Sequence, residues 1–132
     1  MFEIHDSEIK SYTVNIDDDD SSIVFTLLLA DKKYCNLIFE NMLAFNFEEQ
    51  NNYQNVIRDI SEGDITKFVD KHKSLLEEGV GKVLPLYYTD AAKIKEHLLI
   101  NSYKTFYIAA SQGLNGWIIS KNMVVKPETK ES

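Results

Sequence analysis

The sequence predicts an α+β fold, in which a curved, mainly antiparallel sheet of about five to seven strands carries one long and one short helix on one face. Two patterns predict this fold. Short runs of strand-forming residues, separated by polar turns, occupy the first half of the chain and its last third. Between them, over 64–100, apolar residues recur at the three- and four-residue spacing of a helix face.

The first half predicts a meander of antiparallel strands. Asp17 to Ser22 are residue types that favour turns, and they separate two apolar runs. A second turn at 30–33 precedes a third run, whose continuation places Phe45 and Phe47 on one face. The predicted strands are 9–16, 23–30, 34–39 with its continuation to residue 49, and 56–60.

The second half predicts the two helices and the closing strands. The longer helix begins after the N-cap residue Asp64 and ends at Gly79, and the shorter one covers 90–99. The apolar stripe of the longer helix includes His72, which we interpret as a core histidine, while Lys71 is expected to face solvent. Strands are predicted at 103–110 and 117–125, on either side of a turn at 111–116.

Length and composition predict the organisation of the chain and its location. The 132 residues are the size of one domain, which we expect over 1–125, with a disordered polar tail over 126–132. The N-terminal MFEIHDSEIK lacks the basic and apolar regions of a signal peptide. No apolar run reaches the ~18 residues needed to cross a bilayer, so we expect a cytoplasmic protein that does not bind membranes.

Charge is unevenly distributed along the chain. Residues 1–66 contain 14 acids and 4 bases, a net charge of −10, whereas residues 67–132 contain 7 acids and 10 bases, a net charge of +3. Nucleic-acid-binding domains usually have a basic patch and a high isoelectric point. This chain has a single arginine and a net charge of −7, so we expect no nucleic-acid partner.

Nothing in the sequence predicts a catalytic, metal or cofactor site. Cys35 lies in an apolar run and is interpreted as a small buried residue. His5, Asp6 and Ser7 are hydrolase residue types, but side chains adjacent in sequence rarely point together, so we read them as a turn. The acids of 17–20 lack the alternation and the glycine of a calcium loop, and the histidines are widely spaced. We therefore expect no enzyme, no metal and no cofactor.

Several segments resemble a family of small, uncharacterised bacterial proteins. They are HDSEIKSYTVN at 5–15, IFENMLAFNFE at 38–48, NVIRDI at 55–60 and FYIAASQGLNGWIIS at 106–120. The F-x-x-V-L-A-Y-x-F-E-like segment of the family is matched by Phe39, Leu43, Ala44, Phe45, Phe47 and Glu48. The closing S-S-x-G-L-x-G-W is matched by Ser111, Gly113, Leu114, Gly116 and Trp117, with Ala110 in place of the first serine. Similar small acidic proteins often act as immunity partners of bacterial toxins, and the resemblance implies that role.

The first functional hypothesis is a non-catalytic protein-binding module, an immunity protein that neutralises a bacterial toxin through an acidic surface. Such a surface accelerates association with a partner that has a basic surface. The candidate residues for this face are Asp17, Asp18, Asp19, Asp20, Asp31, Glu48 and Glu49.

Two other hypotheses remain open. One is a small-ligand-binding or enzymatic domain with a pocket between the sheet and the helices, lined by Phe45, Tyr87, Tyr88 and Trp117. The other is a homo-oligomeric subunit that associates through a sheet edge. A cavity with convergent polar groups would favour the first of these, and sedimentation would test the second.

Overall fold

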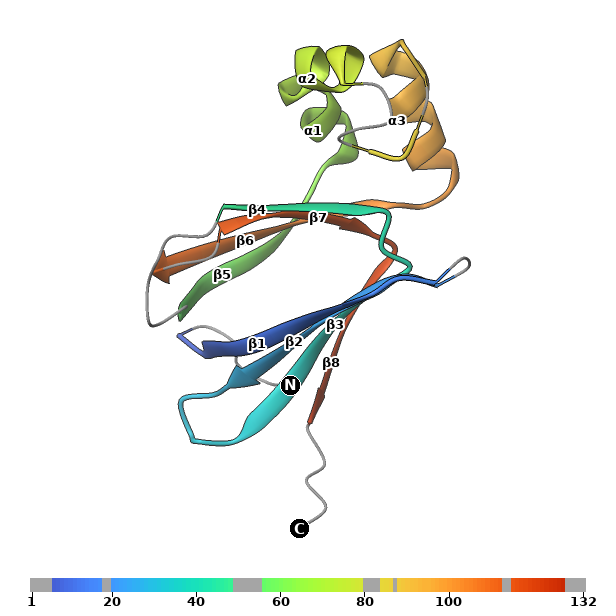
Figure 1. The fold of residues 1–132 in the computed structure, drawn as a ribbon. Coiled ribbons are helices and arrows are strands. Elements are labelled where there is room, and N and C mark those ends of the chain that lie inside the picture. The colour runs from blue at the N-terminus through green and yellow to red at the C-terminus, as the bar shows by residue number, and fades with distance from the viewer. Residues whose placement is uncertain are drawn as a thin grey trace.

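The structure is a computed structural model that describes residues 6–17, 20–48, 56–79, 84–86, 88–112 and 115–127. Its fold is α+β, and the antiparallel sheet predicted from the sequence is confirmed. Within the described residues the sheet has eight strands in the order β4-β7-β6-β5-β1-β2-β3-β8 (Figure 1). The strands are β1 Glu8–Asn15, β2 Ser22–Leu28, β3 Tyr34–Glu40, β4 Ala44–Glu48, β5 Val56–Gly63, β6 Lys104–Gln112, β7 Asn115–Ser120 and β8 Asn122–Pro127.

The sheet has more strands than predicted because two predicted strands are each divided by a bend. One bend lies at 41–43, where Asn41 has a φ of 52°, and it separates β3 from β4. The other lies at Lys121 and separates β7 from β8. The bends face each other, since the Leu43 amide donates to the Ile119 carbonyl at 2.7 Å and the Lys121 amide donates to the Glu40 carbonyl at 3.1 Å. The β3–β4 and β7–β8 segments therefore bend at the same place, and the sheet folds over on itself.

The described part of the helical segment contains three helices rather than two. They are α1 Ile65–Lys71, α2 Lys73–Glu78 and α3 Ala91–Ile100. The predicted long helix is broken at His72, whose φ of −107° and ψ of 17° are not helical. Asp64 caps α1 as predicted, because its side chain accepts from the Thr66 amide at 2.7 Å. The break turns α2 away from the axis of α1 and brings His72 to the junction between them.

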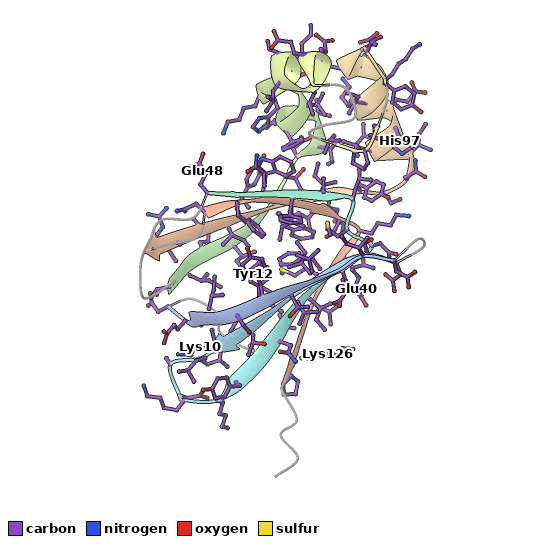
Figure 2. All side chains as sticks on the ribbon, viewed as in Figure 1. Lys10, Tyr12, Glu40, Glu48, His97 and Lys126 are labelled. Carbon is purple, nitrogen blue, oxygen red and sulfur yellow. The ribbon has the colours of Figure 1, made fainter. Side chains whose placement is uncertain are left out.

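The fold has three layers and two hydrophobic cores. Figure 1 shows the β4, β7, β6 and β5 half of the sheet lying over the β1, β2, β3 and β8 half, with the helices on the outer side of the first half. The core between the two halves contains Phe25, Phe39 and Ile118, all fully buried. Figure 2 shows Tyr12 pointing into this space, where its ring lies 5.4 Å from that of Phe25.

The second core lies between the outer half of the sheet and the helices. Phe68, Ile94 and Leu98 of the helices pack there against Trp117 and Ile119 of β7. Consecutive residues of β7 therefore enter different cores, which explains why this strand is apolar on both faces.

None of the helices that the structure describes is long and apolar enough to cross a membrane.

Two predicted boundaries differ in the structure. β8 continues to Pro127, which pairs with Cys35, two residues past the predicted strand end at Val125. Residues 128–132 lie outside the described residues. At the other end, β1 stops at Asn15, and Ile16, predicted as the last strand residue, is 86% exposed.

Candidate functional site

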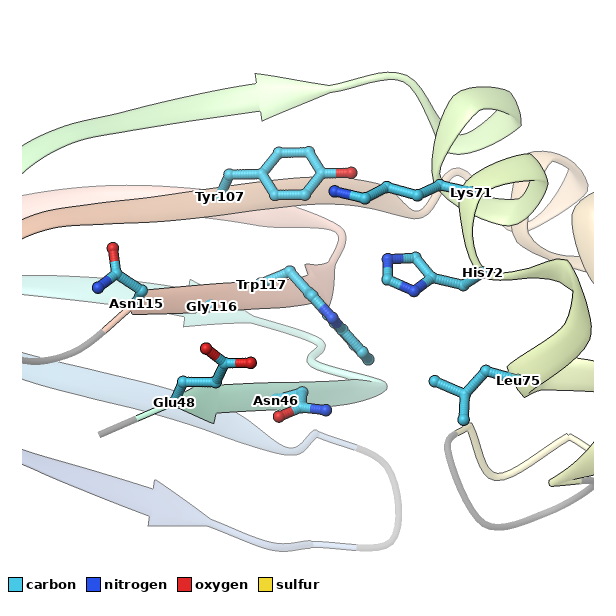
Figure 3. Close-up of a pocket in the computed structure, with 9 residues that line it drawn as sticks. All are labelled: Asn46, Glu48, Lys71, His72, Leu75, Tyr107, Asn115, Gly116 and Trp117. Carbon is cyan, nitrogen blue, oxygen red and sulfur yellow. The ribbon is translucent and has the colours of Figure 1, made fainter. Parts of the chain in front are cut away.

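A pocket of about 380 Å³ lies between the sheet and the helices (Figure 3). This volume falls at the small end of the range for ligand sites, about 300–1,000 Å³. Strands β4, β6 and β7 form its floor, and the α1–α2 segment forms one wall. The lining residues are Asn46, Glu48, Lys71, His72, Leu75, Tyr107, Asn115, Gly116 and Trp117.

The strand register brings the floor residues together. Asn46 pairs with Trp117, which in turn pairs with Tyr107, so these three side chains form a row across three strands. Glu48 pairs with Asn115 two residues along, on the same face of the sheet. Figure 2 shows Glu48 at the end of β4, pointing to the side that carries the helices. The alternation of the strands thus separates a polar pocket face from the apolar face that carries Phe45 and Phe47.

Gly116 allows β4 and β7 to approach closely beneath the pocket. A Cβ atom at this position would meet the Asn46 carbonyl oxygen and would lie 2.9 Å from the Phe47 Cα and 2.8 Å from its Cδ1. Carbon atoms in comfortable contact are about 3.5–4.0 Å apart. Only glycine therefore fits opposite Phe47, whose ring packs against Phe25 in the inner core.

His72 enters the pocket from the α1–α2 junction. Its ring centroid lies 4.7 Å from that of Phe68 and 6.1 Å from that of Trp117. Its Nε2 atom is buried and has no hydrogen-bond partner. Burial, and then the nearby Lys71 charge, lowers the pKa of His72, so the imidazole is neutral at pH 7. The ring can therefore donate or accept a hydrogen bond without adding charge to the pocket.

Among the described residues that line the pocket, one side chain is acidic and one is basic, and both are exposed to solvent. Glu48 comes from β4 and Lys71 from the end of α1. Among the residues that the structure describes, neither side chain takes part in an ion pair. Burial raises the pKa of Tyr107, so its hydroxyl stays protonated and can donate. The pocket therefore offers one negative charge, one positive charge and neutral hydrogen-bonding groups around the indole of Trp117.

Of the four residues predicted to line a pocket, the three that the structure describes are not brought together. Trp117 lies in the pocket described above. Phe45 points to the other face of the sheet, where its ring lies 5.0 Å from that of Phe47. Tyr88 lies beside α3, with its ring 5.8 Å from that of His97, in a separate hollow. Tyr87 lies outside the described residues.

The acidic residues predicted to form one face are, as far as the structure describes them, divided between different parts of the molecule. Asp17 and Asp20 flank the β1–β2 connection, beside Lys121. Asp31 lies in the β2–β3 turn, where its side chain accepts from the Lys33 amide at 3.0 Å. Successive turns of an antiparallel meander lie at opposite ends of the shared strand, so the length of β2, roughly 20 Å, separates these groups. Glu48 belongs to the pocket, and Asp18, Asp19 and Glu49 lie outside the described residues.

Four residues of the pocket were not predicted from the sequence to lie there: Asn46, Lys71, His72 and Tyr107. Lys71 was predicted to face solvent, and it is exposed, but its place beside a pocket was not predicted. His72 was predicted to be a core residue of a continuous helix over 64–79. The break at His72 moves both to the pocket wall. The alternation of Asn46 with Glu48 and of Asn115 with Trp117 was a readable signal, although it could not show that the two strands pair.

Other reactive groups in the described residues do not form a site. Cys35 is fully buried, as predicted, and burial, followed by the Asp31 charge, raises the pKa of its thiol. The described residues contain no group of three or more histidine, cysteine, aspartate or glutamate side chains that could hold a metal ion. His5 lies outside those residues.

Comparison with known proteins does not assign the chain to a family. No family model matches it, and neither the curated proteins nor the solved structures include a significant match.

Proposed function

We propose that this protein is a binding protein for a small polar molecule, which it holds in the pocket between the sheet and the helices. The observation that carries the proposal is the convergence of Glu48, Lys71, His72 and Tyr107 around Trp117. Ligand sites typically combine an apolar surface with a few polar groups that fix the orientation of the ligand. Here the indole supplies the apolar surface, and the sheet and helices each supply polar groups.

Binding without catalysis fits the surroundings of His72. A catalytic imidazole is usually oriented by a carboxylate and faces a nucleophile. The described partners of His72 are instead the rings of Phe68 and Trp117. Cys35 is buried in the inner core and does not line the pocket.

Fluorescence offers a direct test, because Trp117 is the only tryptophan of the chain. A library of small polar molecules is screened for changes in its emission, and hits are measured by calorimetry. Leu75→Arg, at the pocket wall, should abolish binding of the hits. Leu99→Arg is the matched control, since Leu99 has a similar exposure, 51% against 48%, and lies on α3 outside the pocket. A library without hits, or hits equally affected by both substitutions, would contradict the proposal.

A second candidate function is the binding of a basic protein, such as a toxin, through acidic residues. The observation that favours it is the exposure of Asp17 and Asp20 at one end of the sheet, within a half of the chain whose net charge is −10. Association with such a partner should slow steeply as salt is added. Replacing both residues with asparagine should slow it further, whereas Asp31→Asn, at the opposite end of β2, should not. An association rate that is independent of salt would exclude this steering.

Association through a sheet edge also stays a prediction. Strands β4 and β8 end the observed strand order and are the candidate edges. Sedimentation of the purified protein distinguishes a monomer from a homo-oligomer.

A further inference from the structure

We infer, resting on the proposed function, that the pocket takes a zwitterionic ligand: a small molecule with an ammonium group at one end and a carboxylate group at the other. The inference comes from the positions of the two charged side chains. Figure 3 shows Glu48 and Lys71 on either side of Trp117 and Gly116, one on the sheet and the other on the helix wall.

The two charges are left uncompensated across the pocket. Side chains as flexible as lysine and glutamate pair readily when they are close, yet no ion pair joins Glu48 and Lys71 in the structure. Each is therefore available to a ligand group of the opposite sign. A molecule with only one charge satisfies one side chain and is repelled by the other, whereas a zwitterion satisfies both.

The remaining polar groups add no net charge. Tyr107 is a protonated phenol, His72 is neutral, and Asn46 and Asn115 are amides. Figure 3 shows the Tyr107 hydroxyl and the Lys71 ammonium pointing toward one another, so both can donate to one carboxylate. We therefore place the carboxylate of the ligand at Lys71 and Tyr107, its ammonium at Glu48, and its carbon body along Trp117.

Matched probes of different length test the inference. Each set contains a zwitterion, its carboxylate analogue and its amine analogue: glycine with acetate and ethylamine, γ-aminobutyrate with butyrate and butylamine, and ε-aminocaproate with caproate and hexylamine. Binding is followed through the indole signal of Trp117 and by calorimetry. For at least one length, the zwitterion should bind about tenfold more tightly than both of its analogues, the factor expected of one additional charged hydrogen bond.

Two variants assign the ends of the ligand. Glu48→Gln should remove the preference for the zwitterion over the carboxylate analogue and keep its preference over the amine. Lys71→Gln should remove the preference for the zwitterion over the amine analogue and keep its preference over the carboxylate analogue. Lys67→Gln, an exposed lysine of α1 that does not line the pocket, is the control and should change neither preference.

The outcomes separate the two proposals. The zwitterion inference is overturned if no zwitterion binds more tightly than its analogues. It is also overturned if each variant loses both preferences, the one over the carboxylate analogue and the one over the amine analogue. The proposed binding function still stands in that case if the library yields ligands whose binding is abolished by Leu75→Arg and kept by Leu99→Arg. If neither the probes nor the library binds in the pocket, both proposals are wrong.

Discussion

The close approach of β4 and β7 predicts that Gly116→Ala destabilises the protein. A Cβ atom would lie 2.9 Å from the Phe47 Cα and would also meet the Asn46 carbonyl oxygen. Restoring a contact of about 3.5–4.0 Å with the Phe47 Cα alone requires β4 to move by roughly 0.6–1.1 Å, and the tighter contact with the Asn46 oxygen requires a larger movement. Overpacking of this kind costs about 1–3 kcal/mol. Since β4 carries Asn46 and Glu48, the same displacement should also weaken binding in the pocket.

The direction of the change in stability distinguishes a steric conflict at Gly116 from the usual effect of replacing glycine with alanine. The backbone of Gly116 does not have a positive φ, so alanine is tolerated there in conformational terms. Without a steric conflict, replacing glycine with alanine would stabilise the fold by about 0.4–1 kcal/mol, because the unfolded chain loses freedom. The contact with β4 therefore reverses the direction of the change.

Urea unfolding followed by Trp117 fluorescence measures the change. With a slope of about 1.5–2 kcal/mol per molar urea, the midpoint should fall by roughly 0.5–2 M. Gly63→Ala is the matched control, because its Cβ would meet only side-chain atoms, those of the Tyr107 ring, rather than backbone. Its midpoint should fall less. A Gly116→Ala midpoint equal to or above that of the parent protein would refute the close packing of β4 on β7.

Further predictions concern other parts of the fold. Burial, followed by the charge of Lys71, lowers the pKa of His72, so stability that is present above about pH 6.5 should be lost as pH falls. The urea midpoint of His72→Phe should therefore fall less than that of the parent protein between pH 7 and pH 5. An equal fall in the two proteins would contradict this prediction. Cys35 should react with a thiol reagent only on unfolding, at a rate that rises with urea, and rapid labelling of the native protein would contradict its burial. Asp64→Ala should destabilise the protein by about 0.5–2 kcal/mol by removing the cap on the Thr66 amide, whereas Asp70→Ala, an exposed control on α1, should cost less in thermal unfolding. Phe68→Ala should cost about 3–5 kcal/mol and lower binding in the pocket, because Phe68 supports His72 and Trp117; a midpoint near that of the parent would contradict its central place in the outer core.

Several local features were predictable from the sequence. Alternation and helical spacing located most strands and α3, and side-chain chemistry identified the cap Asp64. The shared face of Phe45 and Phe47 followed from the two-residue period of a strand. These features depend on residues that are close in sequence, which is why a pattern reveals them.

The pocket depends on contacts that a local pattern does not contain. Periodicity shows that Asn46 and Glu48 share a face, and that Asn115 and Trp117 do, but it does not show which strand lies beside which. The pairing of Asn46 with Trp117, the bends at 41–43 and at Lys121, and the break at His72 arise when the sheet folds over and the helices pack on it. The sequence by itself determined most of the strand positions, α3, the Asp64 cap and the acidic first half, because each depends on near neighbours or on composition. Only the tertiary structure decided which polar side chains meet, because pairing between distant strands sets the site's geometry.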